Sequence, residues 1–206
     1  MENVSHSTHQ HYDPEASKIG MWLFIFTELL LFGGLFVLYS VYRFLNPEAF
    51  HLAAEELNTT VGAVNTIILL VSSMTVAMST SALQKGKPGT AIVLLEITFM
   101  LGLLFLVNKY FEWGIKFEHG IYPGSTYLME NMSKGEILFF GLYFVMTGLH
   151  ALHIIIGLSI IGVALSRISK GKVHARRAAL LENAGLYWHL VDIIWIFLFP
   201  LFYLIT

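Results

Sequence analysis

Five long apolar stretches, separated by short polar segments, dominate the pattern of this 206-residue chain. Each is about 20 residues or longer, which is enough for an α-helix to cross the roughly 30 Å of hydrocarbon in a bilayer. We predict membrane-spanning helices near residues 19–44, 61–83, 90–110, 137–166 and 185–205. The pattern therefore predicts an all-α integral membrane bundle, preceded by a flexible polar tail over residues 1–18.

The composition agrees with a membrane protein rather than a soluble one. Apolar residues make up 56% of the chain, charged residues make up 13%, and the mean hydropathy is +0.68, whereas soluble domains carry about 25% charged residues. The polar start and the long first apolar stretch, which lacks a small-residue cleavage site, argue against a secretory signal peptide. Cysteine is absent, which excludes disulfides and thiolate metal sites.

The distribution of basic residues predicts the orientation in the membrane. With a cytoplasmic N-terminus and a periplasmic C-terminus, eight Lys and Arg lie on the inner side and four on the outer side. The positive-inside rule favours this arrangement. The inner residues are Lys18, Lys85, Lys87, Arg167, Lys170, Lys172, Arg176 and Arg177. The outer residues are Arg43, Lys109, Lys116 and Lys134.

The polar segments predict where helices end and how they are joined. Asn46 and Pro47 are expected to end the first long helix, and Asn58 is expected to cap the second. Residues 111–136 are predicted to form a longer outer loop that contains Gly114, Gly120, Pro123 and Gly124. An amphipathic stretch is predicted around residues 176–181 of an inner loop. We find no internal repeat and no separate soluble domain.

Four ionisable residues inside the predicted helices are the main functional candidates. Glu28, Glu96, His189 and Asp192 fall in the inner half of three different spans, and charged groups at such depth are costly and usually functional. Each also has a structural interpretation, because a buried carboxyl group can bond a neighbouring helix and His189 with Asp192 forms an i, i+3 pair. We predict a role in proton uptake or lipid contact, with helix packing as the alternative.

His150 and His153 are predicted to make polar contacts between helices. Their i, i+3 spacing is a weak metal signal, because transition-metal sites usually need three or four ligands. His189 could be a third ligand only if the helices converge suitably. Interhelical hydrogen bonding by histidine is the simpler interpretation. The tail contains three more histidines, which we assign to a flexible segment rather than to a metal site, namely His6, His9 and His11.

Three segments in this order resemble subunit III of the haem–copper oxidases, the family of cytochrome c and quinol oxidases. The stretch 20–32 resembles the family's glutamate-bearing helix, with Glu28 at the glutamate. The stretch 148–157 has its Gly-x-His-x-x-His-x-x-x-Gly pattern, and 187–195 resembles its final helix. The resemblance covers nearly the whole chain from Ile19 onward.

The resemblance implies the bacterial five-helix form of a family whose mitochondrial members have seven helices. It implies a non-catalytic subunit of a respiratory terminal oxidase in the bacterial inner membrane, without haem, copper or other cofactor of its own. Haem and copper are expected in the partner catalytic subunit. The implied partners are oxidase subunits I and II and phospholipid. A larger respiratory supercomplex is also a possible partner, and nucleic acid is not expected to bind. Glu28 corresponds to the family's carbodiimide-reactive glutamate, and the implied role is support of proton uptake and protection of the catalytic subunit.

Two other functions remain open at the level of sequence. A related five-helix protein accompanies some bacterial nitric oxide reductases, and the segments 50–58, 116–120 and 198–204 resemble that branch. A stand-alone carrier or channel is the third hypothesis, motivated by the charged residues inside the spans. Against it, the chain has no inverted repeat, and Pro200 is the one proline deep in a span.

Overall fold

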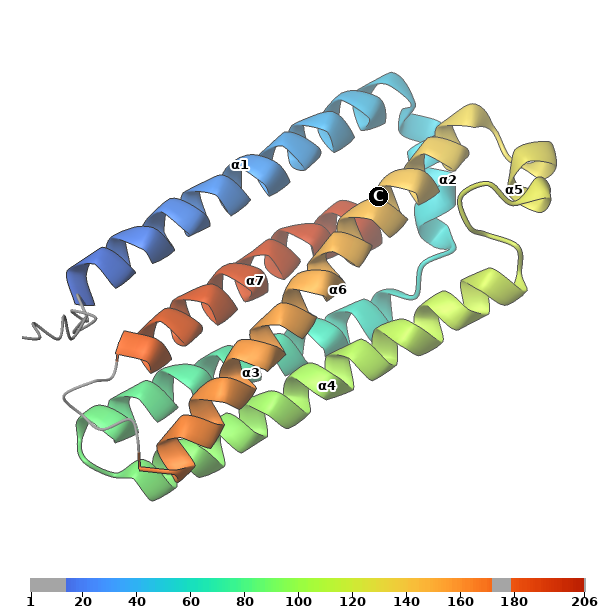
Figure 1. The fold of residues 1–206 in the computed structure, drawn as a ribbon. Helices are drawn as coiled ribbons and strands as arrows, with labels where there is room; N and C mark the ends of the chain where they lie inside the picture. The colour runs from blue at the N-terminus through green and yellow to red at the C-terminus, as the bar shows by residue number, and fades with distance from the viewer. Residues whose placement is uncertain (1–13, 172–178, 206) are drawn as a thin grey trace, which may run out of the picture.

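The fold is an antiparallel bundle of long helices (Figure 1). A computed structural model describes residues 14–171 and 179–205, and within these ranges the chain is helical with no strand. The helices are α1 (Pro14–Leu45), α2 (Pro47–Glu55), α3 (Thr59–Gln84), α4 (Pro88–Glu118), α5 (Thr126–Asn131), α6 (Lys134–Ser169) and α7 (Ala179–Tyr203). Five of them, α1, α3, α4, α6 and α7, are long and apolar enough to cross a membrane, which confirms the predicted all-α membrane bundle.

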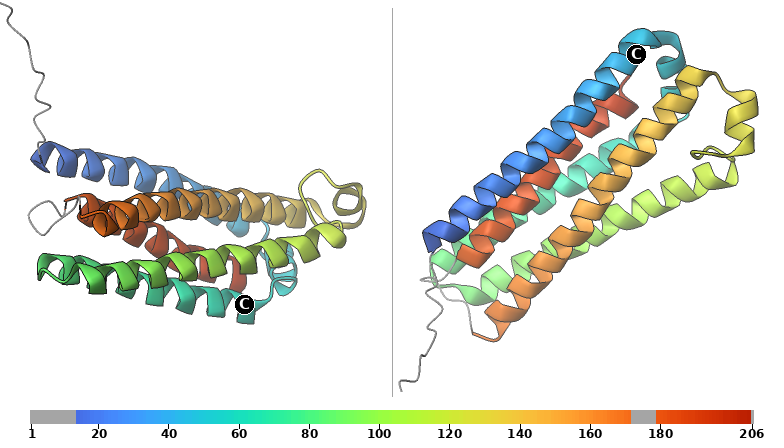
Figure 2. Two further views of the ribbon diagram at one scale, coloured as in Figure 1. Left: turned by 60° about the horizontal axis from the view of Figure 1, so that its bottom comes forward. Right: turned by 45° about the horizontal axis from the view of Figure 1, so that its top comes forward.

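Helix α7 lies inside the bundle and α1 lies at its edge. Helix α7 contacts α3, α6 and α1, while α3 packs most extensively against α4. In Figure 2 (left), α1 and the α3–α4 pair lie on opposite sides of α7. Of the residues in the most apolar segment of each helix, 56% are buried in α7 but only 6% in α1. One broad face of α1 is therefore apolar and uncovered in the isolated chain.

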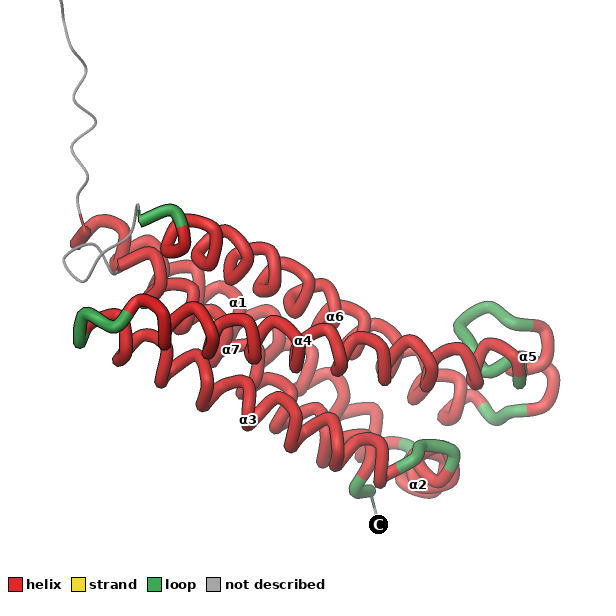
Figure 3. Tube along the Cα trace, turned by 90° about the horizontal axis from the view of Figure 1, so that it is seen from below, coloured by secondary structure: helices red, strands yellow, loops and turns green. Residues whose placement is uncertain are grey.

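The two ends of the bundle differ (Figure 3). Helices α2 and α5 and the C-terminus lie at one end, which we call the α2/α5 end. The start of α1 and the turn between α3 and α4 lie at the other, which we call the turn end. Gly86 in that turn has φ 71°, a left-handed conformation that glycine adopts without steric penalty. At the turn end, Glu182 of α7 lies 3.4 Å from Lys18 of α1 and accepts a 3.1 Å hydrogen bond from Gln84 of α3.

Local sequence explains where the helices begin and end. Asn46 is non-helical between α1 and α2, and Pro47 starts α2 because proline suits the first helical position. Asn58 caps α3 by accepting a 3.2 Å hydrogen bond from the Val61 N–H. Helix α1 begins at Pro14, inside the segment predicted to be a polar tail, for the same reason that α2 begins at a proline.

The prediction of a long outer loop over residues 111–136 is wrong. Helix α4 continues to Glu118, and the remainder contains α5 and the start of α6. The polar residues Lys109, Glu112 and Lys116, spaced i, i+3 and i+7, share one face of α4 and are buried against the bundle. Because these charged groups point inward and make hydrogen bonds there, they do not end the helix.

Some predicted features lie outside the described residues. These are the tail histidines His6, His9 and His11 and the basic residues Lys172, Arg176 and Arg177. The described part of the predicted amphipathic stretch, residues 179–181, forms the start of α7. Helix α7 thus begins six residues before the position predicted from hydrophobicity, with Leu181 buried.

Trp188 fixes α7 between its neighbours. Its indole N–H donates a 3.0 Å hydrogen bond to the Ser72 hydroxyl of α3. Its ring fills space left by two glycines, because a Cβ added at Gly102 of α4 or Gly157 of α6 would lie 2.8 Å from the indole. This close packing sets the rotation of α7 and thereby the direction in which His189 and Asp192 point.

Candidate functional site

Glu28 and His153 form a polar pair between α1 and α6. The Glu28 Oε2 lies 2.9 Å from the His153 Nε2. The side chains are only 13% and 8% exposed, respectively, so the pair is largely desolvated within the chain itself. Both residues lie near the middle of their helices, at the depth where a bilayer would be most apolar. The structure therefore brings together two of the candidates predicted from sequence.

The hydrogen bonds of His153 define how many protons the pair can hold. The His153 Nδ1 lies 2.7 Å from the carbonyl oxygen of Leu149, which can only accept, so Nδ1 carries a hydrogen and donates it. The contact between Nε2 and Glu28 then needs one further proton, held either by the carboxyl group or by the ring. Both arrangements have zero net charge, so neither buries an uncompensated charge. The geometry thus creates a site for one shared proton.

Aromatic side chains hold this pair in place. The Phe32 ring of α1 meets the His153 ring edge-on at 5.4 Å, and the Tyr187 ring of α7 stacks on it at 6.5 Å. The Tyr187 hydroxyl donates a 3.1 Å hydrogen bond to the carbonyl oxygen of His153. These contacts from three helices restrict the imidazole to one orientation and shield the shared proton from solvent.

His189 and Asp192 belong to a separate polar group on α3 and α7. The His189 Nδ1 lies 2.6 Å from the Ser73 hydroxyl, and Ser73 is also a neighbour of Asp192. Asp192 is 3% exposed, and neither carboxylate oxygen has a hydrogen bond of good geometry to a described residue. No hydrogen bond or ion pair among the described residues joins this group to Glu28.

The remaining two candidates lie apart from both groups. Glu96 is exposed on the outer face of α4. His150 is fully buried, but neither ring nitrogen has a hydrogen-bond partner among the described residues. Its ring lies 5.5 Å from that of Phe105 and 5.2 Å from that of Trp195. The predicted polar helix contact of His150 is thus a ring contact with α4 and α7, whereas His153 makes a hydrogen bond to α1.

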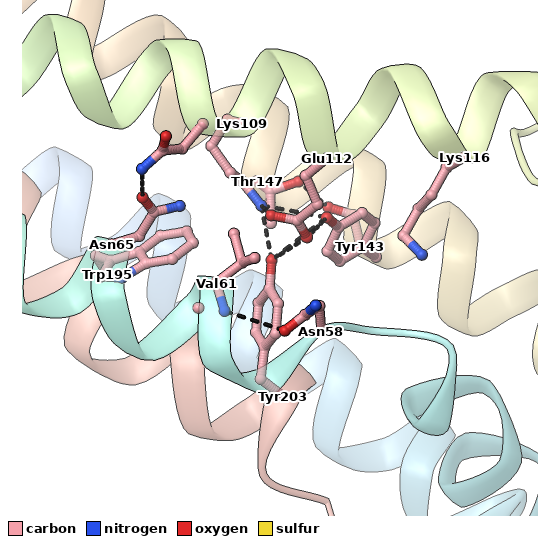
Figure 4. A network of polar contacts seen from close by, with 12 residues as sticks. Asn58, Val61, Asn65, Lys109, Glu112, Lys116, Tyr143, Thr147, Trp195 and Tyr203 are labelled. Carbon is pink, nitrogen blue, oxygen red and sulfur yellow. Dashed lines mark hydrogen bonds and ion pairs between the residues drawn. The ribbon is translucent and has the colours of Figure 1, made fainter.

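A buried charged network that sequence reasoning missed joins α4, α6 and α7 (Figure 4). The ammonium group of Lys109 donates hydrogen bonds to Glu112 at 3.2 Å, to the Tyr143 hydroxyl at 3.2 Å and to the Tyr203 hydroxyl at 2.7 Å. Both tyrosine hydroxyls in turn donate to the Glu112 Oε1, at 2.6 Å from Tyr143 and 2.5 Å from Tyr203. We call these four residues the Lys109 network.

Every strong donor and acceptor of the Lys109 network is used. An ammonium group has three hydrogens, and all three are placed. Lys109 also lies 5.1 Å from the ring centre of Trp195 and of Tyr143, contacts that stabilise a desolvated cation. The sequence signal for this network was the spacing of Lys109, Glu112 and Lys116 on one helical face. It was missed because the predicted membrane helix ended at Tyr110, before Glu112 and Lys116.

A metal centre is not suggested by the part of the chain that the structure describes. Within residues 14–171 and 179–205, no three His, Asp or Glu side chains converge as a metal-binding group. The polar groups described above can hold protons and hydrogen bonds.

Known proteins resemble this chain along its whole length. The family model for cytochrome c oxidase subunit III matches residues 1–206. Cytochrome c oxidase subunit 3 of Thermostichus vulcanus is 32% identical, over 96% of this chain and 92% of that protein. The same subunit of Corynebacterium diphtheriae is 31% identical, over 93% of this chain and 89% of that protein. A haem–copper oxidase subunit I+III of Aeropyrum pernix is 29% identical, over 96% of this chain and 24% of that protein.

Proposed function

The chain belongs to the cytochrome c oxidase subunit III family, and we propose that Glu28 and His153 are the residues through which it assists its catalytic partner. It is a multi-pass protein of the bacterial inner membrane and a subunit III of a terminal oxidase. The proposal concerns what the subunit contributes to oxygen reduction. Haem and copper belong in this proposal to the partner, where they carry out the electron transfer and oxygen chemistry.

The first contribution is assembly with the catalytic subunit. The relative in which subunits I and III are fused supports an association with subunit I. The uncovered apolar face of α1 and the other exposed apolar faces supply the surface that a membrane partner or lipid would cover. We extend the proposal to subunit II, to phospholipid and to a larger respiratory assembly, which the same exposed surfaces can accommodate.

The second contribution is support of proton uptake from the inner side of the membrane. The observation that carries this proposal is the one-proton pair of Glu28 and His153 between α1 and α6. We propose that in the assembled complex this shared proton is exchanged with a water molecule or lipid headgroup that reaches the pair. His189, Asp192 and the exposed Glu96 are weaker candidates for the same role or for lipid contact, because none of them is bonded to this pair.

The proposed orientation places the turn end in the cytoplasm. The described basic residues predicted to be on the inner side lie at this end: Lys18 at the start of α1, Lys85 and Lys87 in the α3–α4 turn, and Arg167 and Lys170 at the end of α6. Their gathering at one end supports the assignment under the positive-inside rule. Protons for oxygen reduction would then enter from the side on which these residues lie.

The test compares Glu28→Gln with wild type in the purified complex. Glutamine keeps the size and a hydrogen bond to His153 but cannot release a proton. We expect unchanged haem content, slower proton uptake and fewer turnovers before the enzyme inactivates. Glu130→Gln, at an exposed position on α5, is the matched control. Equal proton uptake and equal turnover lifetime in Glu28→Gln and wild type would contradict the proposed role.

A nitric oxide reductase, the alternative raised by the sequence, is not favoured by the relatives that this chain resembles. The three relatives described above are named as oxidases, which supports oxygen as the substrate. Oxygen uptake by the purified complex would support the oxidase, and uptake of nitric oxide alone would favour the reductase.

A further inference from the structure

A groove of about 440 Å³ opens between α3 and α4 at the α2/α5 end. It exists because α4 runs on to Glu118, whereas α3 begins only at Thr59 after a turn from α2. The groove belongs to the α3–α4 pair, on the opposite side of α7 from α1 (Figure 2). It is therefore separate from Glu28 and His153.

One part of the groove is apolar and open to the membrane. Val64 of α3 and Phe111 and Ile115 of α4 line it and are 46%, 64% and 56% exposed. Along α4 the groove extends from Lys116 to Asn108, a rise of about 12 Å. A hydrocarbon chain lying against these side chains would cover apolar surface that the chain itself leaves bare.

The other part of the groove holds charged groups that are only partly satisfied. Lys116 is 5% exposed, and its ammonium group donates one hydrogen bond, at 3.0 Å, to the backbone carbonyl of Glu56. It also lies 5.6 Å from the ring centre of Phe140. Since an ammonium group has three donors, two are not used by hydrogen bonds to described residues. In Figure 4, Lys116 points away from the Lys109 network.

The carboxylates around the groove are of two kinds. Glu112 lines it, but its oxygens already accept from the Lys109 network. Glu56 is exposed and within electrostatic range of Lys116, yet the two form no direct ion pair. The groove therefore presents an ammonium group with two unused donors and an exposed carboxylate within electrostatic range of it, next to an apolar wall.

We propose that this groove binds a phospholipid with a zwitterionic headgroup that carries a primary ammonium. The lipid phosphate accepts hydrogen bonds from Lys116, the headgroup ammonium faces Glu56, and one acyl chain lies along Val64, Phe111 and Ile115. Charge balance selects a zwitterionic headgroup, because an anionic headgroup would meet Glu56 without a compensating charge. A primary ammonium is favoured over a quaternary one because only the primary ammonium can donate hydrogen bonds to Glu56. Binding also supplies Lys116 with the acceptors that the protein does not provide.

A zero-length cross-link tests this contact directly. The tagged complex is reconstituted into vesicles of phosphatidylethanolamine and treated with a water-soluble carbodiimide. This reagent joins a carboxyl group to a primary amine as an amide, with loss of water. We expect this chain to gain the mass of one lipid less one water, with the adduct on Glu56. Phosphatidylcholine, which has no N–H, is the matched lipid control and is expected to give no adduct.

The protein controls separate a specific site from surface chemistry. Glu56→Gln should abolish the adduct, whereas Glu55→Gln should keep it, because Glu55 is a neighbouring exposed carboxylate that lies 3.6 Å from His51 instead. Lys116→Met should lower the yield about tenfold through loss of a charge-assisted hydrogen bond. Val64→Trp fills the apolar part without changing any charge, should lower the yield similarly, and serves if Lys116→Met fails to assemble. Haem content verifies assembly of each variant.

Several outcomes would overturn the proposal. They are no adduct in wild type, an adduct that survives in Glu56→Gln, or equal yields in wild type, Lys116→Met and Val64→Trp. Cross-linking of Glu56 to a lysine of another subunit would show that protein, not lipid, occupies the groove. None of these outcomes bears on Glu28, so the proposal can fail while the role of Glu28 stands.

Discussion

Removing the charge of Lys109 tests whether the Lys109 network holds the α2/α5 end of the bundle together. The substitution Lys109→Met keeps the length of the side chain but removes all three of its hydrogen bonds. Glu112, only 8% exposed, would then retain its negative charge with two tyrosine donors and no countercharge within hydrogen-bond reach.

The expected loss of stability follows from this uncompensated charge. Breaking a buried ion pair by removing one partner typically costs about 3–5 kcal/mol. We expect the lower end, about 3 kcal/mol, because Tyr143 and Tyr203 still donate to Glu112. At about 2–4 °C per kcal/mol for a chain of this size, the unfolding temperature should fall by about 6–12 °C. Lys109→Met combined with Glu112→Gln should recover part of this loss, because the buried charge is gone.

The assay is thermal unfolding of the purified complex. Unfolding is monitored by how much of this chain stays bound to the tagged partner subunit at each temperature. Lys85→Met, which removes an exposed lysine in the α3–α4 turn, is the control and should leave the temperature unchanged. An unfolding temperature for Lys109→Met within about 2 °C of wild type would refute the reasoning. So would a double variant whose loss equals the sum of the two single losses, because that result means the two residues do not interact.

Three further substitutions test the packing of the bundle by the same thermal assay. Gly102→Ala should destabilise the chain by about 1–3 kcal/mol, because the new Cβ meets both Leu158 and Trp188 at 2.8 Å, whereas Gly141→Ala, with nothing within 4 Å, should be neutral. Trp188→Phe should lower stability by about 1–3 kcal/mol, since it leaves the buried Ser72 hydroxyl without its donor and opens a gap beside Gly157. If Ser72→Ala lowers stability by the same amount, the loss comes from the hydrogen bond alone and the packing part of the argument is wrong. Tyr39→Phe removes the hydroxyl that caps the Leu201 carbonyl at the end of α7 and should cost about 1 kcal/mol, an effect that would be absent if water replaces the hydroxyl.

The number and type of long helices could be predicted from hydrophobicity because the bilayer fixes their length. Helix ends at Asn46–Pro47 and Asn58 followed from local rules of capping and proline geometry. The extension of α4 to Glu118 did not, because an apolar-span criterion treats Lys109 and Glu112 as interfacial residues. Only tertiary contacts with Tyr143 and Tyr203, which are distant in sequence, make these charges buried ones.

The candidate site was predictable as a set of residues but not as a set of pairs. Glu28 and His153 stood out because ionisable groups are rare in membrane helices. Their contact depends on which faces of α1 and α6 meet, and a helix that is apolar all round gives no such information. His150 lies three residues from His153 but on a face of α6 that meets α4 and α7, so its ring packs between Phe105 and Trp195.

The most direct test of the central claim is to purify this chain by an affinity tag in mild detergent and analyse what accompanies it. A reduced-minus-oxidised spectrum and the uptake of oxygen and nitric oxide are recorded on the same sample. A subunit III of a terminal oxidase predicts haem bands together with cyanide-sensitive oxygen uptake. Haem bands with uptake of nitric oxide alone, or a stable preparation without haem, would contradict the account.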